Sequence, residues 1–173
     1  MKMTFSITIY EALFLLFTIG GGIFALLQWK QKHKLERANF LNAALTKIRD
    51  DKEFASVLYA IDYGEQWYTN DFITDHLKEQ QFDRVFAYFD YLCYLKDRHI
   101  LSKKEFQIFE YRIVRMANSD SFMSYMFNLY HFSKRNGTRV SFCHLLMYLK
   151  KSKLLEDSFW NVNSSEYTKL LNI

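Results

Sequence analysis

The chain has 173 residues, of which 50% are hydrophobic and 24% are charged, and its formal net charge is +4. This composition excludes a polytopic membrane protein, because the charged fraction is too high, and a disordered chain, because the apolar fraction is too high. There is no proline, and only five glycines are present. β-Sandwiches and barrels need frequent turn residues, so the composition favours long helices joined by short polar links.

The strongest feature of the sequence is an apolar segment of 21 residues, from Ile7 to Leu27, in which Glu11 is the only charged residue. A helix needs about 20 mostly apolar residues to cross the hydrocarbon core of a membrane. A cleaved signal peptide is the alternative, but only Lys2 precedes the segment and no small-x-small cleavage motif follows Ala25. The pattern therefore predicts a retained transmembrane helix.

Positive charges lie mainly on one side of this segment. It is followed by Lys30, Lys32, Lys34 and Arg37, whereas a single lysine precedes it. By the positive-inside rule, residues 30–173 are expected in the cytoplasm and the N-terminus outside. We therefore expect a single-pass protein of the plasma membrane, with membrane lipid as a partner of these lysines.

Small residues form one stripe of the apolar segment. Thr18 and Gly22 are four residues apart, and so are Gly21 and Ala25. This spacing lets two membrane helices approach closely and predicts self-association, although glycine is also simply common in membrane helices. Glu11 has two interpretations as well. We favour a side chain that reaches the headgroups over one that lines a proton or ion path.

Beyond the apolar segment, hydrophobic residues recur at three- and four-residue spacing, the period of an amphipathic helix. The fold class is therefore all-α, with the membrane helix continuing past Trp29 into a cytosolic bundle. This bundle is expected to hold four to five antiparallel helices whose aromatic stripes form the core. We expect three parts: residues 1–29 as the membrane anchor, residues 30–150 as the cytosolic helical domain, and residues 151–173 as a C-terminal tail.

Local residue patterns predict where the helices of the domain begin and end. The pair Asp50-Asp51 is expected to stop the long first helix. Ser102 and Glu105 have the spacing of a capping box, and Asp120 is the expected cap of the next helix. Further helix ends are expected at Gly64 and at Asn136-Gly137, and the last helix is expected to include Val140 and Phe142. The segment 65–76 lacks a helical period, and its Trp67 and Tyr68 are expected to pack onto the core.

Two stretches carry a family resemblance, "ALLQWKQKHKLERANFLN" at residues 25–42 and "FDRVFAYFDYLCYLKDRHILSKKEF" at residues 82–106. In both, the chain resembles a bacterial family of unknown function that has one N-terminal membrane helix and a small cytosolic helical domain. The resemblance covers most of residues 12–150 and consists of hydrophobic patterns. It implies a bacterial inner-membrane protein, and it supplies no catalytic residues.

The patterns that mark most enzyme classes are missing from the sequence. The one glycine cluster, at residues 20–22, lies inside the apolar segment, so it is not a phosphate-binding loop. Cys93 and Cys143 are 50 residues apart, and the histidines show no metal-binding pair. The cysteine spacing also gives no disulfide framework, which fits a reducing compartment. We therefore expect no cofactor, no metal site and no catalytic centre.

One spacing is a specific exception. Arg139 and His144 have the Arg-x4-His spacing that resembles the ribonuclease motif of HEPN domains, which are small helical bundles. The resemblance implies that His144 would act as general base and Arg139 would stabilise the phosphate charge. A polar residue usually follows the arginine in that family, whereas Val140 follows it here. We favour the alternative, in which Arg139 caps a helix and His144 packs against the domain.

Charge is distributed unevenly along the domain. Residues 121–155 contain six cations and no acid, whereas residues 38–120 contain 11 cations and 14 acids. A surface of this kind could bind anionic lipid, nucleic acid or an acidic protein partner, or it could pair with the domain's own acids. We call these six residues the basic strip: Lys134, Arg135, Arg139, Lys150, Lys151 and Lys153.

These features together predict a single-pass membrane protein whose cytosolic helical domain acts as a binding, assembly or sensing module. The family resemblance extends this expectation to bacterial stress or phage defence. Two alternatives remain open: a membrane-tethered ribonuclease of HEPN type, and an effector that perturbs the bilayer after assembling through its glycines.

Overall fold

The computed structural model describes residues 8–161, and within that range it contains seven α-helices, one 3-10 helix and no strand. The all-α prediction is therefore confirmed. The chain divides into two compact units, residues 1–46 and residues 47–173, and each is considered by itself. The elements are α1 (Ile9–Asp50), α2 (Lys52–Asp62), α3 (Asn70–Thr74), α4 (His76–Asp97), α5 (Lys103–Ala117), α6 (Asp120–Arg135), α7 (Cys143–Lys151) and η1 (Asp157–Trp160).

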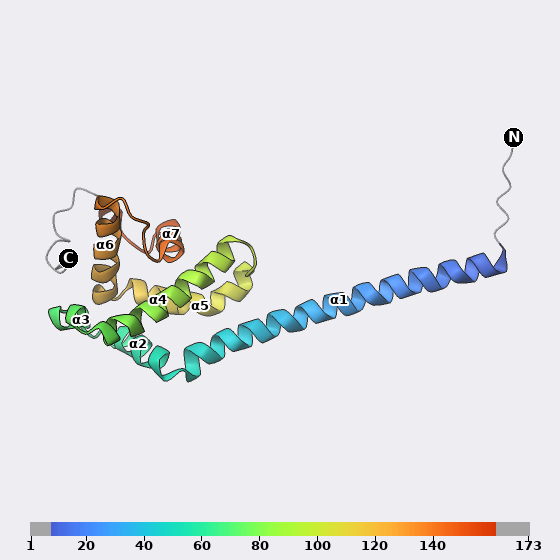
Figure 1. The fold of residues 1–173 in the computed structure, drawn as a ribbon, viewed down its shortest axis with the longest axis horizontal. Coiled ribbons are helices and arrows are strands. Elements are labelled where there is room, and N and C mark those ends of the chain that lie inside the picture. The colour runs from blue at the N-terminus through green and yellow to red at the C-terminus, as the bar shows by residue number, and fades with distance from the viewer. Residues whose placement is uncertain (1–7, 162–173) are drawn as a thin grey trace. The chain divides into compact units, whose positions relative to one another are not determined.

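The helix α1 is a single unbroken element of 42 residues (Figure 1). This confirms that the apolar segment continues into the polar stretch after Trp29, because no proline or other helix breaker separates the two. At 1.5 Å per residue the helix is roughly 63 Å long, whereas the hydrocarbon core of a membrane is about 30 Å thick. The helix is therefore long enough to cross a bilayer and to extend well beyond it.

The caps at several helix ends confirm the sequence predictions. The helix α1 ends at Asp50, as predicted, and Asp51 then begins α2 by accepting hydrogen bonds from the backbone amides of Glu53 and Phe54. Ser102 and Glu105 form the predicted capping box at the start of α5. Gly64 and Gly137 follow the ends of α2 and α6 with positive φ, a conformation that glycine adopts without strain.

Three boundaries differ from the sequence predictions. Ser119, not Asp120, caps α6, because its hydroxyl accepts a hydrogen bond from the backbone amide of Phe122. Val140 and Phe142 lie before α7 rather than within it, since Phe142 adopts a left-handed backbone that a helix cannot continue through. The segment 65–76 contains the five-residue helix α3. The unit from residue 47 onward therefore holds one more helix than expected among its described residues.

The helix α4 is the central element of this unit, because it contacts α2, α3, α5 and α7 (Figure 1). Phe86, Phe89 and Leu92 on α4 are fully buried. Trp67, from the connection before α3, packs against rings of α3, α4 and α6 and is 2% exposed. Its predicted place in the core is therefore confirmed, and so is that of Tyr68.

Candidate ligand-binding site

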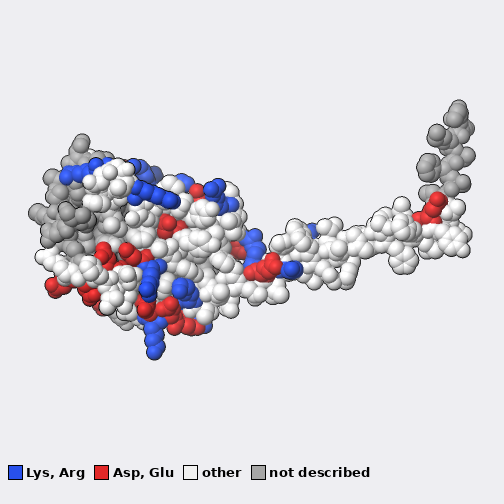
Figure 2. All heavy atoms as spheres, viewed as in Figure 1, with Lys and Arg blue, Asp and Glu red and all other residues white. Residues whose placement is uncertain are grey.

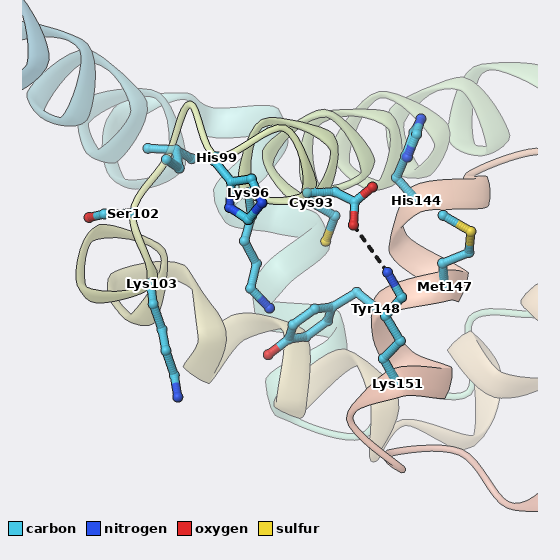
Figure 3. A pocket seen from close by; sticks show the side chains of 11 residues that line it. Cys93, Lys96, His99, Ser102, Lys103, His144, Met147, Tyr148 and Lys151 are labelled. Atoms are coloured by element: carbon cyan, nitrogen blue, oxygen red, sulfur yellow. Dashed lines mark hydrogen bonds and ion pairs between the residues drawn. The ribbon is translucent and has the colours of Figure 1, made fainter.

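An open cavity of about 580 Å³ lies between the end of α4, the α4–α5 connection, the start of α5 and one side of α7. We call it the lysine cavity (Figure 3). Its titratable lining comprises Lys96, Asp97, His99, Lys103, His144 and Lys151. The less polar part of the wall consists of Cys93, Leu101, Met147 and Tyr148. Its volume lies within the range of roughly 300–1,000 Å³ that is common for small-molecule sites.

A tight connection between α4 and α5 brings two of the lysines to the cavity. The backbone amide of Arg98 donates a hydrogen bond to the carbonyl of Tyr94 and so closes the last turn of α4. His99, the next residue, has a positive φ of 57°. The amide of Leu101 bonds back to the carbonyl of Leu95, and α5 starts two residues later at Lys103. Lys96 and Lys103 therefore lie on either side of one short reversal of the chain.

The third lysine comes from α7, which is held against α4. Because Phe142 gives α7 no side-chain cap, Asp90 on α4 caps it instead: its carboxylate accepts the backbone amide of Leu145 at 2.8 Å. In the last turn of α7, Lys151 forms an ion pair with Asp97, with 3.1 Å between nitrogen and oxygen (Figure 3). The contact between α4 and α7 therefore sets the width of the cavity.

Lys96 is the most enclosed of the three lysines. Its ammonium lies 4.0 Å from the ring centre of Tyr148 and 4.8 Å from that of Phe106. Burial lowers the pKa of Lys96 below the ordinary lysine value, Cys93 and Glu110 partly oppose this effect, and the positive charges of Lys103 and Lys151 add a smaller lowering. The cavity therefore concentrates positive charge that its own residues do not fully neutralise.

Few carboxylates line the cavity. Among the residues that the structure describes, Asp97 is the only acidic one that lines the cavity, against three lysines. Glu110 lies nearby, but its carboxylate accepts a hydrogen bond from the phenol of Tyr148 at 2.5 Å. Burial, and then this bond, raise the pKa of Tyr148 to about 12, so its phenol stays protonated at neutral pH.

The remaining wall offers no evident nucleophile. Cys93 is 2% exposed, and burial raises the pKa of its thiol, so the reactive thiolate is suppressed. Ser102 uses its hydroxyl in the α5 cap. Among the described residues, no group of three His, Cys, Asp or Glu side chains is arranged to hold a metal ion. The arrangement is suited to binding an anion rather than to covalent chemistry.

The structure separates the two residues of the ribonuclease-like spacing. His144 lines the lysine cavity, 5.0 Å from the ring centre of Tyr94, and its buried Nδ1 has no hydrogen-bond partner among the described residues. Arg139 is exposed in the connection between α6 and α7 and does not line this cavity. No hydrogen bond or ion pair joins Arg139 to His144 in the described part of the chain. His144 is packed as expected, whereas Arg139 lies outside any helix.

The small residues of the apolar segment all lie on α1. Thr18 donates its hydroxyl hydrogen bond to the carbonyl of Phe14, one turn earlier in the same helix. A Cβ added at Gly21 or Gly22 would meet no atom within 4 Å. The fold of the single chain, as described, does not require glycine at these positions, and Ala25 adds one more small side chain to the stripe. Self-association through it stays a prediction.

The residues of the basic strip have surroundings of different kinds. Lys134 and Lys150 lie over the rings of Tyr130 and Trp160, and Lys151 is paired with Asp97. Lys153 has a positive φ in the turn after α7. Arg135 and Arg139 are exposed. Of the strip, Lys151 alone lines the lysine cavity.

Sequence reasoning missed the lysine cavity. A local signal for it existed, since residues 96–104 contain Lys96, Arg98, Lys103 and Lys104 against the single acid Asp97. The contribution of Lys151 had no such signal, because it comes from a helix more than 40 residues later.

Comparison of the chain with protein-family models finds no match, and comparisons with curated proteins and with solved structures find none either. The functional argument therefore rests on the geometry of this chain alone.

Proposed function

We propose that the chain is a single-pass membrane protein whose helical domain is a binding module for small anions, which it holds in the lysine cavity. The observation that carries the proposal is that Lys96, Lys103 and Lys151 all line one cavity, in which Asp97 is the only acidic lining residue among those that the structure describes. Like charges repel, so three ammonium groups in one cavity are unfavourable until an anion enters.

Membrane anchoring is supported by the character of α1. It is the one helix in the described range that is long and apolar enough to span a membrane. A core helix of a soluble protein can have this composition, but the apolar stretch of α1 has none of its residues buried, and Figure 2 shows it almost free of charged side chains. A cleaved signal sequence is the other alternative, and the lack of a cleavage motif argues against it. The lysines after the segment favour a cytoplasmic domain.

The test uses the full-length chain in nanodiscs of phosphatidylcholine, so that the bilayer itself carries no net charge. Inorganic phosphate and sulfate are each titrated, and binding is measured by calorimetry and by the shift in thermal unfolding. Anions that bind the folded domain are expected to raise its unfolding temperature in proportion to the logarithm of their concentration. Replacing Lys103 and Lys151 together by Gln is expected to remove the shift. No binding of either anion to the wild type would overturn the proposal.

The ribonuclease alternative gains one observation, namely that His144 lines the lysine cavity with a buried Nδ1 that has no hydrogen-bond partner. It predicts that the full-length protein cleaves single-stranded RNA and that His144→Ala abolishes the cleavage at unchanged helicity. The binding-module proposal predicts no cleavage by either protein.

A further inference from the structure

Among the described residues that line the lysine cavity, three lysines against one carboxylate give a formal excess of two positive charges. A carboxylate or a chloride ion would neutralise only one of them. A phosphate monoester carries a charge of about −1.5 to −2 at pH 7 and offers three acceptor oxygens, one for each ammonium group. Lysine is a common phosphate ligand that acts as a point charge. Both the net charge and the number of donors therefore match a phosphate group.

The cavity is larger than a phosphate ion requires. Its volume of about 580 Å³ is that of a site for an organic molecule. The apolar wall beside the lysines is mainly Met147, which is 43% exposed, because Leu101 is only 4% exposed. An organic group attached to the phosphate would cover this wall and remove its apolar surface from water.

The lysines differ in how firmly they are placed. Lys96 is held over the rings of Phe106 and Tyr148, and no carboxylate forms an ion pair with it in the described part of the chain. Lys151 is more exposed and is paired with Asp97, an ion pair that Figure 3 draws as a dashed line. Lys96 is thus a fixed donor inside the cavity, whereas Lys151 can exchange Asp97 for a ligand oxygen.

From this arrangement we infer that the lysine cavity binds an organic phosphate monoester, with its phosphate between Lys96 and Lys151, where the flexible side chain of Lys103 can turn toward it, and with its carbon skeleton against Met147. The inference rests on the proposed function and narrows its ligand from small anions to one chemical class. Two sources supply this chemistry, a soluble phosphate ester and the headgroup of phosphatidic acid.

The first experiment titrates AMP, adenosine and inorganic phosphate into the full-length chain in phosphatidylcholine nanodiscs, with calorimetry as the readout. AMP is expected to bind at least tenfold more tightly than inorganic phosphate, because its organic group covers the apolar wall, and adenosine is expected not to bind. A second arm titrates short-chain phosphatidic acid against short-chain phosphatidylcholine as control. Tighter binding of either phosphate ester than of inorganic phosphate supports the inference and identifies the source. If neither ester exceeds inorganic phosphate, the inference is overturned while the proposed anion-binding function stands.

Variants then locate the site. Lys103→Gln and Lys151→Gln are each expected to weaken binding of the preferred ester by about tenfold, the usual order for a lost charged hydrogen bond. Lys104→Gln is the matched control, since Lys104 neighbours Lys103 on α5, is exposed and does not line the cavity. It is expected to change affinity little.

Asp97→Asn tests the same site in the opposite direction. It removes the only acidic lining residue and releases Lys151, so the ester is expected to bind more tightly, by about threefold. A gain of affinity cannot arise from misfolding. Equal effects of Lys103→Gln and Lys104→Gln, together with no gain from Asp97→Asn, would overturn the assignment of the ligand to this cavity.

Discussion

The phenol of Tyr125 on α6 donates a hydrogen bond of 2.6 Å to the carboxylate of Asp83 on α4. Tyr125 is 3% exposed. Burial raises the pKa of Asp83 above its ordinary value, and the hydrogen bond from Tyr125 only partly offsets this effect. Burial also raises the pKa of Tyr125, and the Asp83 charge raises it further. The pair therefore links α4 to α6 while keeping an ionised carboxylate in an unfavourable environment.

Replacing Tyr125 by Phe is expected to lower the free energy of unfolding by about 1–2 kcal/mol, because the partly buried carboxylate loses its hydrogen bond. Asp83→Asn should act in the opposite direction at neutral pH, since an amide oxygen still accepts from Tyr125 but carries no charge. Both effects are measured by urea unfolding of the full-length protein.

The pH dependence of Asp83→Asn follows from the sign of the pKa shift. The folded pKa is raised, so the folded state binds the proton more tightly than the unfolded state does. Ionised Asp83 therefore destabilises the folded state of the wild type. This destabilisation is complete above the pKa of folded Asp83, and it disappears as the pH falls below the ordinary Asp pKa of about 4. The advantage of the variant over wild type should therefore shrink between neutral pH and pH 4. The exposed Asp71→Asn serves as control, and an advantage that is independent of pH would contradict this account.

The cap that Asp90 supplies to α7 gives a second prediction. Asp90→Ala leaves the amide of Leu145 without its acceptor, and α7 has no side-chain cap of its own. We expect a loss of about 1–2 kcal/mol in the free energy of unfolding, the usual cost of removing a helix cap. Hydrogen exchange should become faster at the α7 amides, while the amides of α2 should keep their wild-type rates. Equal acceleration in both helices would show a general destabilisation instead.

Two helix boundaries were predictable from the sequence, because the residues that form them are close together in it. Asp51 caps amides two and three residues later, and Ser102 pairs with Glu105. The start of α7 was not predictable. Val140 and Phe142 continue the apolar spacing of the helix, and a hydrophobic pattern carries no information about a positive φ at Phe142.

The lysine cavity was also not predictable from the sequence, because it is formed by residues that are far apart in the chain. The sequence placed Lys96 and Lys103 in a stretch with an excess of acids and placed Lys151 in the basic strip. The packing of α7 against α4 brings them to one cavity, and that packing depends on contacts between residues 55 apart, such as Asp90 and Leu145. The net charges of residues 38–120 and of residues 121–155 therefore could not reveal the lysine cavity.

Membrane anchoring is tested by fractionation of cells that express the full-length chain. Because α1 contains a window of 18 residues with a mean hydropathy of 1.9 and few charges, the chain should remain in the membrane after carbonate extraction. A matched variant with Leu15 and Phe17 both replaced by Arg should be extracted, since each arginine in the apolar stretch costs about 2.5–3.5 kcal/mol on insertion scales. Recovery of the unmodified full-length chain in the soluble fraction would rule out the anchor.

The lowered pKa of Lys96 predicts how ligand affinity depends on pH. A bound phosphate dianion favours the charged ammonium, so affinity should fall as Lys96 loses its proton. Because burial lowers the pKa of Lys96, this fall should begin below 10.5, the ordinary lysine value. Lys96→Arg keeps its charge throughout that range, and a guanidinium also stacks on aromatic rings, so the fall should move to higher pH. Affinity for the ester that binds best, followed by calorimetry between pH 7 and pH 10, is the measurement. Lys104→Arg, outside the cavity, should reproduce the wild-type profile, and the same profile for Lys96→Arg would show that Lys96 does not contact the phosphate.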